Sequence, residues 1–93
     1  MANQTLHVQI ISPQQLLLDT DASSVSSKNL QGAFDILPQH TNFITMVEKS
    51  PIIVRLPHQK PIIFKFDLAI VLVSGNKVSI YTYIQPQIEN IKT

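Results

Sequence analysis

Residues 51–67 have the sequence PIIVRLPHQKPIIFKFD, in which two alternating segments flank a turn bounded by prolines. Ile52 and Val54 share one face of the first segment, and Phe64 and Phe66 share one face of the second. A period of two residues is typical of half-buried strands. Because proline cannot donate to a strand ladder, it marks where each segment stops. These residues therefore predict a β-hairpin.

Similar short segments lie on both sides of this hairpin, separated by turn residues. Further strands are predicted at residues 6–10, 14–20, 22–27, 33–37, 43–47, 68–73 and 77–83. We expect the first two to pair as a hairpin, the serine-rich third to be an edge or short strand, and the apolar segment 68–73 to be covered on both faces. Such spacing is typical of an all-β sandwich or barrel of antiparallel strands, here about eight to ten of them.

The length and composition indicate one folding unit. The 93 residues leave room for one core, and we expect the sandwich to span residues 1–84, followed by a tail or linker stub at residues 85–93. The absence of cysteine excludes disulfides and thiolate metal sites. No signal peptide pattern is present, and no apolar run approaches the roughly 18 residues of a membrane span. A soluble intracellular protein is therefore expected.

Charge is low and scattered along the chain. Seven Lys and Arg residues and six Asp and Glu residues give a formal net charge of +1. Nucleic-acid binding usually requires a cluster of cationic side chains, and the sequence has none. Because 14% of residues are charged while 44% are hydrophobic, some apolar side chains must lie on the surface. Such a surface indicates protein partners.

No combination of side chains points to catalysis or metal binding. The histidines His7, His40 and His58 lack the spacing of a metal site; we expect His7 on an exposed strand face and His58 in a turn. The segment Asp19-Thr20-Asp21 is turn-like, and its two aspartates suit either a solvated turn or a weak cation pair on one strand face. With two glycines and no nucleophile elbow, the chain is predicted to have no catalytic, cofactor or metal site.

The aromatic residues have two interpretations. The four phenylalanines are Phe34, Phe43, Phe64 and Phe66. They would form a stacking platform if the fold were a small oligonucleotide-binding barrel. Because they alternate with polar residues and no basic side chains are interleaved, packing in the core is the better interpretation. Tyr81 and Tyr83 share one strand face, which suits either an interface or a second buried face.

One segment is more specific than the composition. Residues 32–45 read GAFDILPQHTNFIT, and this sequence resembles the loop and strand signature of the ATP synthase epsilon subunit, called delta in mitochondria. The segments LHVQIISP, residues 6–13, and DLAIVLVSGNKVSI, residues 67–80, are similar to the first strand and the last hairpin of that family. The resemblance spans about residues 6–83 and implies a flattened β-sandwich.

The sequence also departs from the family pattern. The family usually has glycine where Asp35 and Gln39 stand, proline at Asn42, and two glycines near residues 68–69. It also continues into a C-terminal pair of helices with inhibitory and, in some members, ATP-sensing functions, whereas this sequence stops at Thr93. The comparison therefore implies a divergent member without the functions of the helical pair.

The resemblance implies a mechanical function. In this family the sandwich binds the rotating gamma subunit and lies against the polar loops of the membrane c-ring, so that proton-driven rotation is coupled to the catalytic head. The chain would be a non-catalytic central-stalk subunit without a cofactor, cytoplasmic and peripheral on the inner face of an energy-coupling membrane. On this basis residues 28–34 face the c-ring and residues 38–42 shape the adjoining contact. The implied interface residues are Lys28, Asn29, Leu30, Gln31, Gly32, Ala33, Phe34, Pro38, Gln39, His40 and Asn42.

Two other functions stay open at this point. The same sandwich recruited to a different partner is favoured by the departures from the family pattern, whereas the match in order over nearly the whole length favours the rotor subunit. A nucleic-acid-binding barrel would require a basic aromatic face, which the sequence does not contain.

Overall fold

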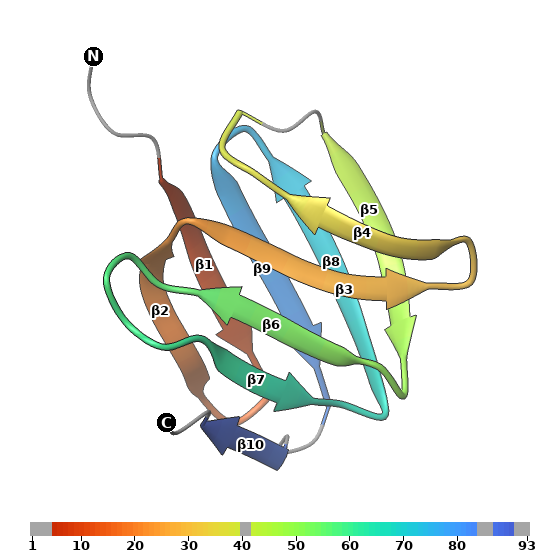
Figure 1. Ribbon diagram of the computed structural model, residues 1–93. Helices are drawn as coiled ribbons and strands as arrows, with labels where there is room; N and C mark the ends of the chain where they lie inside the picture. The colour runs from red at the N-terminus through yellow and green to blue at the C-terminus, as the bar shows by residue number, and fades with distance from the viewer. Residues whose placement is uncertain (1–4, 40–41, 84–86, 91–93) are drawn as a thin grey trace.

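The computed structural model describes residues 5–39, 42–83 and 87–90. These residues form ten strands in two stacked five-stranded sheets (Figure 1). The first sheet has the order β2-β1-β9-β8-β5, and its strands are β2 (Leu16–Ala22), β1 (Leu6–Ile11), β9 (Lys77–Thr82), β8 (Leu68–Ser74) and β5 (Phe43–Glu48). The second sheet has the order β10-β7-β6-β3-β4, and its strands are β10 (Gln87–Asn90), β7 (Ile62–Lys65), β6 (Pro51–Arg55), β3 (Ser24–Asn29) and β4 (Gly32–Ile36).

The all-β sandwich predicted from the sequence is confirmed, including the hairpin of β6 and β7. Neighbouring strands run antiparallel except for β1 and β9, which run parallel. A tight hairpin forces its two strands to be antiparallel, but β1 and β9 are separated by most of the chain, so either direction was available to them. Nowhere in the described ranges is there a helix of the length and apolar character that spanning a membrane requires.

The core lies between the two sheets and is filled by inward-facing residues of strands β1 to β9. The most deeply buried side chains include Val8, Ile10, Val71, Val73, Val78 and Ile80 from the first sheet, and Val25, Ile52, Val54 and Phe64 from the second. Each such residue contributes roughly 1.5–3 kcal/mol relative to exposure. The predicted core role of the phenylalanines is confirmed most clearly for Phe64 and Phe66, whose stacked rings have centroids 6.1 Å apart.

The serine-rich strand β3 corrects one prediction. It lies between β6 and β4 instead of at a sheet edge. The Ser27 hydroxyl donates to the Pro51 carbonyl at 2.9 Å, and the Ser26 hydroxyl accepts a hydrogen bond from the Arg55 guanidinium at 2.5 Å. Because these bonds satisfy the buried hydroxyls, a polar strand is stable inside the sheet. Its composition alone had suggested an edge.

The segment Asp19-Thr20-Asp21 is a second correction, since it lies within β2 and is not a turn. Its residues pair with β1, with Thr20 opposite Val8 and Asp21 opposite His7. Aspartate is uncommon in strands, so the local composition suggested a turn. The pairing with β1 overrides that preference, and the predicted hairpin between the first two strands is confirmed.

Candidate interaction surface

Strand β8 exposes an apolar face to solvent. The sequence predicts that residues 68–73 are covered on both sides, and this is wrong for one side. Val71 and Val73 point into the core, whereas Ile70 and Leu72 remain 41% and 38% exposed. The second sheet covers only the inner face of β8, and no described segment covers its outer face.

The exposed apolar side chains of the first sheet form a continuous row. Direct cross-strand partners lead from β5 to β2 in the order Met46, Ile70, Tyr81, Ile11 and Leu16. Four of these side chains are between 41% and 52% exposed, and Ile11 is half-buried. Partners that face each other across a sheet have side chains in contact range. We call this set the apolar row; its continuity distinguishes it from scattered surface hydrophobic residues.

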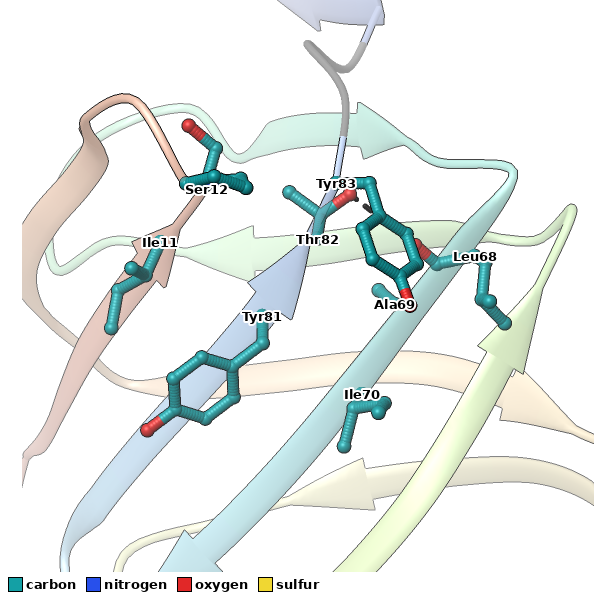
Figure 2. Close-up of a pocket in the computed structure, with 9 residues that line it drawn as sticks. Ile11, Ser12, Leu68, Ala69, Ile70, Tyr81, Thr82 and Tyr83 are labelled. Atoms are coloured by element: carbon teal, nitrogen blue, oxygen red, sulfur yellow. Dashed lines mark hydrogen bonds between the residues drawn. The ribbon is translucent and has the colours of Figure 1, made fainter.

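A pocket of about 330 Å³ lies at the apolar row, where β8 and β9 approach the end of β1 (Figure 2). Its lining residues are Ile11, Ser12, Pro13, Leu68, Ala69, Ile70, Tyr81, Thr82 and Tyr83. The Thr82 hydroxyl donates to the Leu68 carbonyl at 3.2 Å and ties β9 to β8 beneath the pocket. The two tyrosine side chains are exposed, as one of the two predicted interpretations requires. A pocket with aliphatic and phenol walls suits an apolar side chain of a protein partner.

A charged cluster lies on β1 and β2, at the same sheet as the apolar row. His7 Nε2 lies 2.5 Å from Asp19 Oδ1, and His7 Nδ1 lies 3.0 Å from Asp21 Oδ1. The hydrogen bonds to Asp21 and Asp19 raise the pKa of the His7 imidazole above its ordinary value. Among the described residues, no group of three or more His, Cys, Asp or Glu side chains could hold a metal ion. The sequence did not predict this cluster, because His7 meets the two aspartates only through the register of β1 and β2.

The predicted residues 28–34 form the β3–β4 hairpin. Leu30 lies at its tip and is 97% exposed, while Gly32 has φ of 123°, a conformation that glycine permits. The Asn29 side chain donates to Thr45 Oγ1 at 2.9 Å and accepts from the Gln31 backbone N–H at 2.8 Å. Phe34 is half-buried and makes an edge contact with a neighbouring ring of β5. The tip is exposed, and its base is held by the sandwich.

Of the predicted residues 38–42, the described Gln39 and Asn42 lie beside the β8–β9 turn. The Gln39 backbone N–H donates to Asn76 Oδ1 at 2.5 Å, and the Gly75 N–H donates to Asn42 Oδ1 at 3.3 Å. His40 is outside the described residues. The β3–β4 hairpin turn and residues 37–39 lie at opposite ends of β4 (Figure 1). The structure therefore divides the predicted interface residues into two groups, and neither group includes the apolar row.

Residues 5–83 match the family model described as ATP synthase, Delta/Epsilon chain, beta-sandwich domain. The ATP synthase epsilon chain of Campylobacter concisus (strain 13826) is 33% identical over 55 residues, which cover 59% of this chain and 43% of the relative. The ATP synthase epsilon chain of Brevibacillus brevis is 25% identical over 73 residues, 78% of this chain and 55% of the relative. The chain thus spans about half the length of the curated relatives it matches.

Two solved structures share the fold. A chain in the Euglena gracilis mitochondrial ATP synthase structure of OSCP, F1 and the c-ring superposes with a TM-score of 0.81 at 11% identity, covering 95% of this chain and 54% of that one. A chain in the central stalk and c-ring structure of the Tetrahymena thermophila mitochondrial ATP synthase gives a TM-score of 0.70 at 15% identity, covering 90% and 67%.

Proposed function

The chain belongs to the family of ATP synthase delta/epsilon chains, by its beta-sandwich domain, and from this membership we propose that it is a non-catalytic central-stalk subunit. In this function it binds the gamma subunit and the c-ring and transmits c-ring rotation to the catalytic head. It is peripheral, on the inner face of an energy-coupling membrane, through its complex. The observation that carries the proposal is the match of residues 5–83 to the family's beta-sandwich domain, and the apolar row adds a surface that suits a protein partner.

The outer face of the first sheet is the proposed contact for gamma. Its central residues Ile70 and Tyr81 are direct cross-strand partners, and the pocket beside them has room for an anchoring side chain. Interface energy concentrates in a few central residues, with aromatic side chains over-represented among them. Isoleucine, methionine and tyrosine in one row provide apolar area with little charge to desolvate.

The β3–β4 hairpin is the proposed contact for the c-ring. Its tip carries the exposed Leu30 between polar neighbours, and Asn29 fixes its base to β5. A short hairpin with a fixed base can insert a small apolar tip among polar loops at a low cost in conformational entropy. Residues 38–42, including His40, are proposed to shape the adjoining contact.

A second candidate is the same sandwich recruited to a different partner. It is favoured by Asp35, which stands where the family usually has glycine. The Asp35 carboxylate accepts a hydrogen bond from the Ser26 hydroxyl, which in turn accepts from Arg55. A glycine at that position could not form this network. The outer face of the second sheet is therefore more polar with Asp35, and a different partner would bind through these polar groups.

Co-purification tests both candidates. Tagged full-length chain, expressed in cells that contain the synthase, is recovered from membranes in mild detergent, and gamma and c subunits are measured in the eluate. We expect both subunits with the wild type, and a loss of gamma of about tenfold or more in Ile70→Gln/Tyr81→Ser, because central interface truncations cost about 2 kcal/mol or more.

The matched control is Ile53→Gln, which changes a half-buried isoleucine on the second sheet. It should retain gamma. If the double variant and the wild type recovered equal amounts of gamma, the proposed gamma contact on the outer face of the first sheet would be refuted. If the wild-type chain recovered neither gamma nor c subunits, the coupling function would be refuted. The second candidate, a sandwich recruited to a different partner, would then be favoured.

A further inference from the structure

His7 lies between two carboxylates of the neighbouring strand. It pairs across the β1–β2 ladder with Asp21, and Asp19 is two residues away on the same face of β2. Each carboxylate contacts a different ring nitrogen, Asp19 at Nε2 and Asp21 at Nδ1. Because these nitrogens lie on different sides of the imidazole ring, the His7 side chain bridges the two carboxylates of β2.

This geometry selects one protonation state of the ring. An ionised carboxylate only accepts hydrogen bonds, so each ring nitrogen must carry a hydrogen to bond to it. Neutral imidazole has one N–H, whereas imidazolium has two. Both observed contacts are therefore hydrogen bonds at the same time only when His7 is the imidazolium cation.

The other charged neighbour comes from β9. Lys77 is the cross-strand partner of His7 on the opposite side of β1, and the His7 backbone N–H donates to the Asn76 carbonyl at 2.7 Å. Among the described residues, the groups facing His7 are thus two carboxylates from β2 and one ammonium from β9. The pKa of His7 is nevertheless raised, because the hydrogen bonds to Asp21 and Asp19 favour the charged form.

We propose that His7 is a pH-dependent clip that holds the edge strand β2 on the first sheet. Among the described strands, β2 pairs with β1 alone, and the ladder has a register irregularity between Ile10 and Ile11. Ala22 is the one fully buried residue of β2. Leu17 and Leu18 of β2 are only partly buried against the core. An edge strand opens more easily than a central one, so a side-chain bridge changes its local stability. Since Leu16 begins β2 and ends the apolar row, the clip also fixes one end of that row.

The direction of the pH dependence follows from the raised pKa. A group whose folded-state pKa exceeds its unfolded value stabilises the fold fully below the unfolded pKa, and this stabilisation is lost as the pH rises through the folded pKa. The unfolded value for histidine is about 6.5. The clip is therefore closed below the unfolded-state pKa and opens as the pH rises through the raised pKa of His7. This inference concerns the isolated chain and does not depend on the proposed partners.

NMR of the full chain tests the clip. The His7 ring is titrated in the wild type and in Asp19→Asn/Asp21→Asn, and hydrogen-exchange protection of β2 amides, corrected for intrinsic rates, is measured on both sides of the midpoint. We expect a higher midpoint in the wild type than in the double variant, because the two carboxylates favour the imidazolium form. Protection of β2 should fall about two- to fivefold above the midpoint, the size of an exposed ion-pair interaction.

Two controls separate the clip from a general loss of structure. Amides of the central strand β9 should keep their protection through the same pH range. In His7→Gln, β2 protection should no longer change with pH. Equal midpoints in the wild type and the double variant, or β2 protection that is independent of pH in the wild type, would each overturn the proposal.

Discussion

At the scale of single residues, backbone conformation explains where the glycines stand. Both glycines of the chain have positive φ, Gly32 at 123° and Gly75 at 63°. Gln39 also has positive φ, 65°, and it stands where the resemblance to the epsilon family predicts glycine. The local backbone therefore takes a glycine-type conformation although the residue has changed. A side chain in this region costs on the order of 1–2 kcal/mol.

The two glycines differ in which substitutions they should tolerate. An added Cβ meets no atom within 4 Å at either glycine, so the cost of substitution comes from the backbone alone. Asparagine adopts the left-handed conformation of Gly75, whereas φ near 123° is outside the region open to alanine. We expect Gly75→Asn to cost less than about 1 kcal/mol and Gly32→Ala about 1–3 kcal/mol. Urea unfolding measures both free energies, and the reverse order would contradict the backbone argument.

At the scale of elements, the contrast between the two faces of β8 decides which surface can bind a partner. Every residue of β8 that faces the second sheet is buried, and Ile70 and Leu72 on the other side are exposed. This alternation of buried and exposed side chains cannot be recognised from the sequence, because Leu68–Val73 is apolar at every position. A continuous apolar run is typical of strands buried on both faces, so sequence alone favoured the wrong environment.

Strand β10 lies within the predicted tail and pairs antiparallel with β7. The other nine strands form both sheets around the core, so we propose that residues 1–84 fold without the tail. A chain ending at residue 84 should give a cooperative β-type thermal transition by circular dichroism. Loss of a four-residue edge ladder worth about 1 kcal/mol would lower Tm by about 4–8 °C. An unfolded truncated chain would refute the domain boundary, and an unchanged Tm would show that β10 adds no stability.

At the scale of the whole molecule, one core shared by both sheets holds the sandwich together. Ile80 on β9 is completely buried in this core, and Leu30 at the β3–β4 tip is exposed. Total stability of such domains is about 5–15 kcal/mol, so one core side chain is a substantial part of it.

The two residues should therefore differ in their effect on unfolding. Ile80→Ala removes buried methyl groups and leaves a cavity, which costs about 2–5 kcal/mol. Leu30→Ala should stay within about 0.5 kcal/mol of the wild type. The measurement is the free energy of unfolding in urea at one pH. Similar losses in both variants would mean that the hairpin tip packs against the sandwich.

The sequence by itself determined the features that depend on neighbouring residues. The period of two in residues 51–67 and 77–83 predicted strands and their buried faces, and the turn residues predicted the hairpins. The segment 32–45 pointed to the family that the comparisons established. These features are local, since strand alternation and turn conformation are set within a few residues.

Only the tertiary structure decided how distant segments pair. The parallel ladder of β1 and β9, the internal position of β3, the apolar row across five strands and the bridge at His7 all depend on register between separate strands. A shift of one residue would turn each side chain to the other face of its sheet. Register is fixed by the burial of apolar side chains from many strands in one core, so no short stretch of sequence can determine it.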